Sequence, residues 1–349
     1  MAGKRNGKRT TITLKEVAEL SGVHASTVSR ALNPATRSMV MPAVVERILK
    51  AAKKLGYQPD PVAASLRTGR SSLVGILVPD IANTVFAPIL SGATERLDEQ
   101  GYSVIVSDVG NEQGRQIDLV AKLMARRVDG LILATVSRDD PLVAYCIERN
   151  LPAVLVNRAE TQSRLSAVVS DDALGMQLAV DHLSELGHKR IAHLAGPTRH
   201  STGFLRRRGF AQAMAANGFD AAAAPCEVAD AFTREAGAVA MRRLLDTHRG
   251  ITAIAAANDL LALGAYDVLH ERGLSCPGAI SIIGHNDMPL VDMVAPALTT
   301  IRISHREMGR QAADLLHQAI EQPDAPARNV VLPPKLIVRK STAAPPSTK

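Results

Sequence analysis

The hydrophobic and polar positions near the start of the chain predict two short helices joined by a tight turn. In the stretch TLKEVAELSGVHASTVSRALN, residues 13–33, apolar residues recur at helical spacing on both sides of Gly22. Thr13 and Glu16 have the spacing of a capping box, and Pro34 stops the second helix. The pattern predicts a helix-turn-helix unit, whose second helix lies in the major groove of DNA. A helical hairpin with a solvated polar face would show the same pattern.

Two further segments follow this unit. Residues 42–55 have proline at the first helical position, an apolar stripe and a terminating Gly56, so we expect a third helix. The next stretch, DPVAASLRTGR at 60–70, has room for only about two helical turns, and isolated helices that short are marginal in water. We therefore expect residues 59–71 to form a hinge helix or linker that folds only when something holds it.

From residue 72 onward, short apolar runs alternate with amphipathic stretches. The runs LVGILV, YSVIVS, GLILA, PAVLVN, RIAHLA, ITAIAAA and SIIGH have the continuous hydrophobicity of buried parallel strands. The stretches with helical periodicity between them are Phe86–Gln100, Arg115–Arg126, Asp172–Leu186, Leu205–Asn217, Glu235–Asp246 and Asp259–Glu271. The alternation runs twice, which predicts an α/β fold with two doubly wound parallel sheets. Two such lobes hold a ligand in the crevice between them, at the carboxyl ends of the strands.

Charge is unevenly distributed along the 349 residues. Residues 1–70 contain 13 Lys and Arg against 4 Asp and Glu, whereas the rest of the chain contains 28 against 30. A basic first fifth on a nearly neutral body is typical of a DNA-binding head, because neutralising phosphates supplies much of the binding free energy. A solvated basic tail would also be basic, but the excess continues past the leader to Lys54, Arg67 and Arg70.

No motif in the sequence indicates catalysis or a cofactor. There is no G-x-x-x-x-G-K-[ST] phosphate loop, no G-x-G-x-x-G after a strand and no G-x-S-x-G nucleophile elbow. The paired carboxylates at 139–140 and 171–172 each precede a helical pattern, so helix capping explains them. The histidines have no metal-ligand spacing. We therefore expect neither an enzyme nor a bound metal or cofactor.

The bulk composition indicates a globular protein of the cytoplasm. Hydrophobic residues make up 46% of the chain and charged residues 21%, and no apolar run approaches the length of a membrane span. The basic N-terminus leads into a capped helix and not into an apolar signal segment. Cys146, Cys226 and Cys276 are scattered, as expected for unpaired thiols in a reducing compartment. We expect no membrane partner.

Several longer motifs carry a family resemblance. The helix-turn-helix stretch is followed by ILKAAKKLGYQPDPVAASLRTGRSSLVGILVPDIAN, RRVDGLIL, HLSELGHKRIAHLAGP, AANDLLALGAYDVLHERGL, ISIIGHNDMP and PALTTIRI. In this order, from residue 11 to about 340, the motifs resemble the LacI/GalR family of bacterial transcription regulators. The resemblance implies a homodimer with helix-turn-helix heads, hinge helices and a periplasmic-binding-protein-like effector core. It implies a repressor whose partners are double-stranded operator DNA and a small-molecule effector.

The resemblance also implies roles for residues of the second helix and of the hinge. Ala25, Ser26 and Arg30 occupy positions that read base edges, and Arg30 is the candidate for a bidentate guanine contact. The positions that contact phosphates are Thr13, Thr27, Ser29 and Asn33. Leu66 matches a hinge leucine that wedges into the minor groove, although a core contact between hinge and body would also use a leucine. His24 stands where the family usually has a capping serine.

The effector positions implied by the resemblance depart more from the family. They are Phe86, Asn157, Phe204, Arg206, Phe232, Asn258 and Asn286. Asn157 and Asn286 replace frequent aspartates, and Phe204 replaces an arginine, whereas Arg206 is retained. We therefore expect a ligand with a carboxylate, such as a sugar acid or an aromatic acid, that pairs with Arg206. Simple core packing explains Phe204 and Phe232 equally well.

These patterns set the expected domain boundaries. They are 1–11 for a basic flexible leader, 12–58 for the helix-turn-helix domain, 59–71 for the hinge, 72–340 for the core and 341–349 for a flexible tail. Within the core we expect one lobe at about 72–167 and 299–329 and the other at about 168–298 and 330–340. The tail lacks heptads, so we expect a dimer and not a tetramer. The alternatives are a solute-binding protein, an α/β enzyme with a DNA-binding head, and a nucleoid-type DNA binder.

Overall fold

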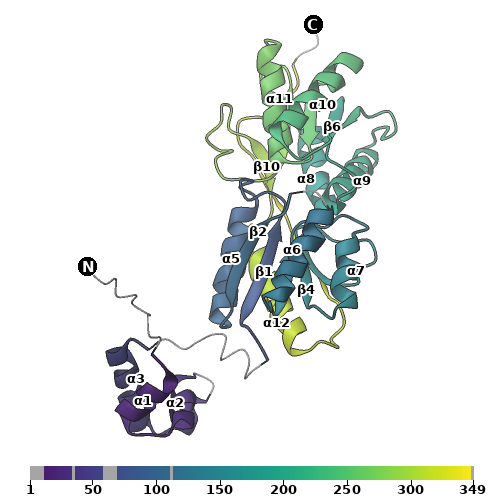
Figure 1. The fold of residues 1–349 in the computed structure, drawn as a ribbon. Helices are drawn as coiled ribbons and strands as arrows, with labels where there is room; N and C mark the ends of the chain where they lie inside the picture. Colours follow the sequence, from purple (N-terminus) through teal and green to yellow (C-terminus); the bar gives the residue numbers. More distant parts are fainter. Residues whose placement is uncertain (1–11, 34–35, 58–68, 111–112, 347–349) are drawn as a thin grey trace, which may run out of the picture. The chain divides into compact units, whose positions relative to one another are not determined.

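The structure, a computed structural model, describes residues 12–33, 36–57, 69–110 and 113–346. The chain divides into two compact units, Met1–Ser71 and Ser72–Lys349 (Figure 1). Leu66 and most of the expected hinge segment lie outside the described residues.

The first unit is a three-helix head. Its elements are α1 (Leu14–Ser21), α2 (Ala25–Leu32), the 3-10 helix η1 (Arg37–Met39) and α3 (Pro42–Leu55). The capping box is present: the Thr13 hydroxyl accepts from the Glu16 N–H at 3.4 Å, and the Glu16 carboxylate accepts from the Thr13 N–H at 2.6 Å. Gly22 ends α1 with φ of 63°. Because Val17 and Val28 are fully buried where α1 and α2 meet α3, the predicted helix-turn-helix unit is confirmed.

The second unit has two lobes, each built on a six-stranded sheet. The first sheet has the order β11-β5-β4-β3-β1-β2 and the second the order β12-β10-β9-β8-β6-β7. The strands of the first sheet are β1 (Leu73–Val78), β2 (Ser103–Asp108), β3 (Gly130–Leu133), β4 (Ala153–Val156), β5 (Ser166–Ser170) and β11 (Asn329–Leu332). Those of the second are β6 (Ile191–Ala195), β7 (Cys226–Val228), β8 (Ala253–Ala256), β9 (Ser281–Asn286), β10 (Thr299–Arg302) and β12 (Lys335–Ile337). The predicted fold class is confirmed, with one antiparallel pair, β10 with β12.

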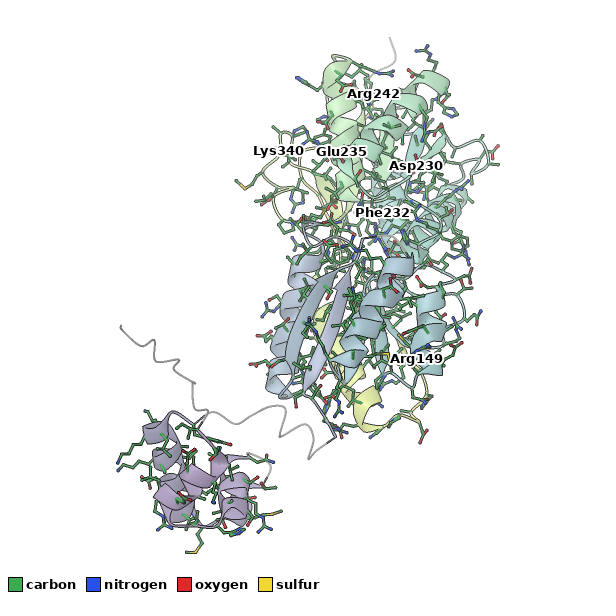
Figure 2. All side chains as sticks on the ribbon, viewed as in Figure 1. Arg149, Asp230, Phe232, Glu235, Arg242 and Lys340 are labelled. Atoms are coloured by element: carbon green, nitrogen blue, oxygen red, sulfur yellow. The ribbon has the colours of Figure 1, made fainter. Side chains whose placement is uncertain are left out.

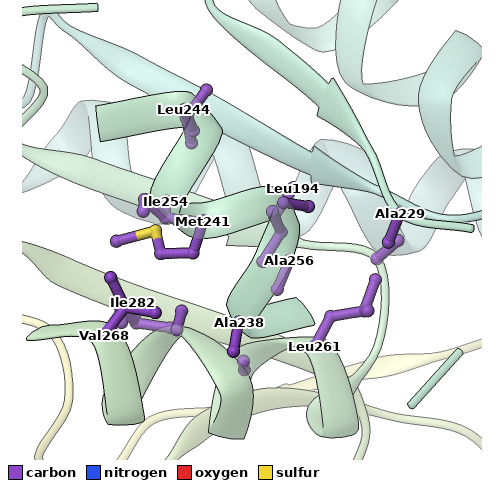
Figure 3. Close-up of a cluster of buried hydrophobic side chains, with 14 of the residues drawn as sticks. Leu194, Ala229, Ala238, Met241, Leu244, Ile254, Ala256, Leu261, Val268 and Ile282 are labelled. Atoms are coloured by element: carbon purple, nitrogen blue, oxygen red, sulfur yellow. The ribbon is translucent and has the colours of Figure 1, made fainter. Parts of the chain in front are cut away.

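Helices cover both faces of each sheet and enclose the hydrophobic cores (Figure 1). In the first lobe they are α5 (Phe86–Glu99), α6 (Gln113–Ala125), α7 (Pro141–Glu148) and α12 (His305–Glu321). In the second lobe they are α8 (Asp172–Glu185), α9 (Ser201–Ala216), α10 (Arg234–Thr247) and α11 (Asp259–Glu271). Figure 3 shows Met241 and Leu244 of α10 close to Ile254 of β8, with Leu261 and Val268 of α11 completing this core. The inner strands β3, β4 and β8 are apolar and fully buried because helices cover both faces of the sheets, whereas the edge strands β2 and β11 are partly exposed.

The chain passes between the lobes three times. It leaves the first sheet after β5, returns after β10, and crosses again between β11 and β12. The lobe boundaries therefore differ from the expected ones: residues 168–170 and 330–332 belong to the first sheet, and 299–302 to the second. Each sheet has one edge strand, β11 in the first and β12 in the second, that the chain supplies only after it has crossed between the lobes. The Asp171 N–H donates to the Leu332 carbonyl at 3.0 Å, so two of the crossing segments lie side by side.

The expectation of a flexible tail from residue 341 is wrong for its first residues. Ser341 is fully buried. Its hydroxyl donates to the Ile282 carbonyl at 2.6 Å and accepts from the Thr299 N–H at 2.7 Å. The Thr342 hydroxyl lies 3.1 Å from that of Thr299. The segment is docked because its hydroxyl and backbone groups complete the hydrogen bonding of β9 and β10.

Helices α5 and α12 approach so closely that their contact requires glycine. A Cβ atom on Gly309 would overlap the Ile89 carbonyl oxygen, and one on Gly92 would overlap the Arg306 carbonyl oxygen. Backbone atoms of a neighbouring helix cannot move aside as a flexible side chain can. The packing of the first lobe therefore depends on the absence of side chains at both positions.

We expect Gly309→Ala to lower the free energy of unfolding by about 1–3 kcal/mol, because the added methyl group forces the two helices apart. The matched control is Gly114→Ala in α6, where a Cβ would meet nothing within 4 Å. That variant should lose no stability and gain up to about 1 kcal/mol, since alanine is the better helix former. Urea unfolding of both variants measures the difference, and equal stability of the two would contradict the role of this crossing.

Candidate ligand cleft and nucleic-acid interface

A polar cleft lies between the lobes, at the carboxyl ends of strands from both sheets. It is narrow, with a cavity volume of about 30 Å³. Its lining residues are Asn83, Val85, Phe86, Asn157, Arg158, Thr202, Arg206, Phe232, Asn258 and Asn286. All the expected effector residues except Phe204 are among them, although their contacts with a ligand remain predictions.

The two asparagines that replace the frequent aspartates sit at the ends of strands with left-handed backbone. Asn157 follows β4 with φ of 64°, and Asn286 ends β9 with φ of 116°. Asparagine tolerates positive φ better than most residues, so these positions turn the chain toward the cleft at modest cost. The Oδ1 atom of Asn286 is buried and has no hydrogen-bond partner among the residues that the structure describes. It is therefore an acceptor that a ligand hydroxyl can satisfy.

Two aromatic side chains form part of the wall and also belong to the cores. Phe86 begins α5, is 3% exposed and packs in the core of the first lobe. Phe232 packs against the core of the second lobe and lies so close to Gly196 that a Cβ there would overlap its ring. Figure 2 shows Phe232 at the end of the second lobe that faces the first. Phe86 and Phe232 therefore pack in the cores and also form part of the wall of the cleft.

Arg206 is already paired within the protein. Its Nε donates to Asp172 at 2.7 Å and its Nη1 to the Ala257 carbonyl at 2.6 Å. Both charged side chains are 3% exposed. The pairing expected between Arg206 and a ligand carboxylate is therefore not favoured, because Asp172 already balances this charge. The sequence hid the pair, since its members lie on different helices, 34 residues apart.

Phe204 does not line the cleft but takes part in a contact between the lobes. The guanidinium carbon of Arg138 lies over the Phe204 ring, 3.7 Å from the ring centroid, in a cation–π arrangement. Beside it, the Arg138 N–H donates to the Arg199 carbonyl at 2.9 Å. The Ala159 N–H donates to the Ser201 hydroxyl at 3.0 Å. These contacts join the first lobe to the start of α9 in the second.

Four lining residues, Asn83, Val85, Arg158 and Thr202, were missed by the sequence analysis. Arg158 is the most consequential, because it brings a second buried guanidinium into the cleft. A signal was available: Arg158 directly follows Asn157 at the end of an apolar run, and ligands bind at the carboxyl edge of parallel sheets. Thr202 lies in the first turn of α9, which also faces this edge.

Asn258 and Asp259 link the cleft to the strands behind it. The Asn258 side-chain oxygen caps α11 by accepting from the Leu261 N–H at 2.9 Å, which leaves its amide group for a ligand. Asp259 is fully buried and accepts from the Thr300 hydroxyl at 2.5 Å and the Met288 N–H at 2.8 Å. Burial raises the pKa of Asp259 from 3.8 to about 7, although both hydrogen bonds act in the opposite direction.

Helix α2 presents the expected DNA-reading positions on its outer face. Ser26 and Arg30 are exposed, whereas Val28 and Ala31 are buried against the other helices. His24 replaces the usual capping serine and still caps the helix, since its Nδ1 accepts from the Ser26 N–H at 3.3 Å. The other expected positions, all partly or fully exposed in this unit, are Thr13, Ala25, Thr27, Ser29 and Asn33. Their contacts with DNA stay predictions.

Two other kinds of site were sought in the same residues. Within the described ranges, no three or more His, Cys, Asp or Glu side chains are grouped so that they could hold a metal ion. Over these same ranges, every helix is too short or too polar to cross a membrane.

Two family patterns match the chain. The pattern described as "Bacterial regulatory proteins, lacI family" matches residues 13–60, and the "Periplasmic binding protein-like domain" matches residues 180–342. The first covers the three-helix head and the second covers most of the second lobe with the final crossing.

Similar proteins match over nearly the whole length. The "HTH-type transcriptional repressor CytR" of Escherichia coli (strain K12) is 33% identical, over 98% of this chain and 100% of its own. A solved structure of the Lac repressor dimer bound to operator and the anti-inducer ONPF has a TM-score of 0.84 at 30% identity, covering 96% and 100% of the two chains. A complex of the transcriptional regulator CelR with cellobiose has a TM-score of 0.73 at 32% identity, covering 95% and 99%. The named relatives are transcriptional regulators and not enzymes.

We expect Asp259 to make stability fall as pH rises from about 4 to about 7. The folded state holds the Asp259 proton more tightly than the unfolded chain, so raising the pH through this window favours unfolding, by up to about 1.4 kcal/mol per pH unit. Asp259→Asn cannot titrate and keeps a similar shape. Urea unfolding at a series of pH values should show the wild type losing stability relative to this variant. Parallel pH profiles of the two proteins would show that folding does not raise the pKa of Asp259.

Proposed function

The chain belongs to the lacI family of bacterial regulatory proteins, and we propose on that premise that it is a repressor that binds a pseudo-palindromic operator as a homodimer. The observation that carries the proposal is the match over nearly the whole chain to named repressors, with a helix-turn-helix head joined to a two-lobed core. A head alone would support only DNA binding, and a core alone only ligand binding.

The head supports sequence reading as well as attraction to DNA. Residues 1–70 hold the whole basic excess of the chain, which favours binding to phosphates of any sequence. Arg30 and Ser26 are exposed on α2, where a helix in the major groove presents side chains to base edges. Arg30 binds guanine in a bidentate manner, and Ala25 and Ser26 contact neighbouring bases.

A homodimer matches an operator with two half-sites, because each copy binds one half-site with its head. Leu290 is 65% and Met293 77% exposed in the segment after β9, which is unusual for large apolar side chains three positions apart. A second copy that covers them removes this apolar surface from water. The matched Lac repressor structure is itself a dimer on its operator.

A small-molecule effector, a sugar or a sugar acid, binds in the cleft and controls the head. The matched CelR structure holds cellobiose, which supports a sugar-like ligand. The contact of Arg138 with Phe204 joins the lobes beside the cleft, so a ligand that prefers another lobe arrangement has to break it. A coupling of about 1–3 kcal/mol between effector and operator is enough to change occupancy usefully.

The test is selection of randomised duplex DNA on the full-length protein at near-physiological salt, followed by sequencing of what is retained. We expect an enriched pseudo-palindrome, and we expect Arg30→Ala to lose about 1–3 kcal/mol of discrimination at one position of each half-site. Competition binding with the selected and the altered sequence measures that loss.

The matched control is Arg47→Ala, which removes the same charge from an exposed position of α3. It should weaken binding to all sequences equally and leave discrimination unchanged. Retention of DNA without sequence enrichment, with and without added metabolites, would contradict the proposed function and favour a nucleoid-type binder.

A further inference from the structure

Arg158 is a buried cation in the wall of the cleft. It follows Asn157 at the carboxyl end of β4 and is 6% exposed. Its Nε and Nη1 atoms are buried and have no hydrogen-bond partner among the described residues. A guanidinium with unsatisfied donors in a ligand cleft is rare, because burying an unpaired charge is strongly unfavourable.

Asp140, the acidic group that acts on Arg158, is already engaged as a helix cap. Asp140 accepts from the Ser137 N–H at 2.7 Å and the Leu142 N–H at 2.9 Å as the cap of α7. Asp172 is paired with Arg206 at 2.7 Å. Among the described residues, no carboxylate oxygen lies within 4.0 Å of a nitrogen of Arg158, which leaves the arginine without a protein counter-ion.

Two further arginines add positive potential around Arg158, and Asp140 opposes them only in part. Burial, followed by the charges of Arg199 and Arg206, lowers the pKa of Arg158 to about 10, so the guanidinium is still protonated at neutral pH. The cleft is also lined by Phe86, Thr202 and Asn258, which lie at the N-terminal ends of α5, α9 and α11. Helix N-termini favour negative charge.

We propose that Arg158 is the anion-recognition residue of the cleft, and that the effector carries an oxyanion, a carboxylate or a phosphate, that pairs with it. This inference rests on the proposed function, since it takes the cleft to be the effector site. It assigns to Arg158 the charge recognition expected of Arg206. Asn157, Asn258 and Asn286 line the same cleft, and their side-chain amides can bond the hydroxyl groups of such an effector.

The first experiment uses the full-length protein and a metabolite extract separated by anion exchange into an anionic and a neutral fraction. We expect the anionic fraction to raise the melting temperature and the neutral fraction to leave it unchanged. Treatment of the anionic fraction with phosphatase separates the two sources of the oxyanion: the shift disappears for a phosphate ester and persists for a carboxylate.

The second experiment tests the residue. Arg158→Met keeps most of the side-chain volume and removes the charge, so it should abolish the shift produced by the anionic fraction. Its own melting temperature without additives should equal or exceed that of the wild type, since the variant no longer buries an unpaired cation. The matched control is Arg199→Met, which removes an exposed positive charge near Arg158 and should keep the shift.

For the compound isolated from the active fraction, calorimetry should give a loss of about 10-fold to 100-fold in affinity with Arg158→Met, as expected for a charge-assisted hydrogen bond. Arg158→Lys, which keeps the charge without the fork of donors, should lose less, and it replaces the methionine variant if that variant does not fold.

Stabilisation by the neutral fraction, stabilisation by neither fraction, or an anionic shift that survives Arg158→Met would each overturn the assignment. Operator selection separates this failure from failure of the proposed function, because Arg158→Met leaves the head unchanged. If the wild type selects an operator and Arg158→Met binds the anionic compound normally, only the assignment of Arg158 fails. If the wild type selects none, the proposed function fails whatever the cleft binds.

Discussion

The buried ion pair between Arg206 and Asp172 fixes the floor of the cleft. It joins α9 to α8, and the second bond of Arg206, to the Ala257 carbonyl, ties both helices to the end of β8. Asn258 comes next in the chain, so the pair also sets where α11 begins. Removing either charge would leave the other buried and uncompensated, which is far more costly than losing an exposed pair.

Burial and the charge of Arg206 together keep the neighbouring histidine neutral. His285 lies 3.7 Å from Asp172, yet burial and the repulsion of Arg206 keep its pKa well below the ordinary value. The ring is therefore neutral, and the interior behind the cleft holds one compensated pair. Arg158 stands outside this arrangement, which is why the two arginines of the cleft differ in character although both are buried.

Local rules recovered much of the fold from the sequence. Thr13 and Glu16 predicted where the first helix begins, Gly22 predicted where it ends, and the apolar runs predicted the strands. These signals can be read from the sequence because each depends on residues that are close together in the chain. The residues of the candidate site were predicted from the family resemblance, and all of them except Phe204 line the cleft. The pairing of Arg206, the removal of Phe204 from the cleft and the docking of Ser341 depend on residues distant in sequence. Periodicity and spacing carry no information about such contacts.

The three crossings between the lobes have a mechanical consequence. A single connection would let the two lobes move apart freely. Three connecting segments, two of them hydrogen-bonded through Asp171 and Leu332, act instead as a short hinge. Such a joint resists stretching and shear and yields mainly to bending and twisting. A change at the cleft is therefore converted into a rotation of one lobe against the other about few axes. Such a restricted rotation gives the same displacement of the lobes each time a small molecule binds.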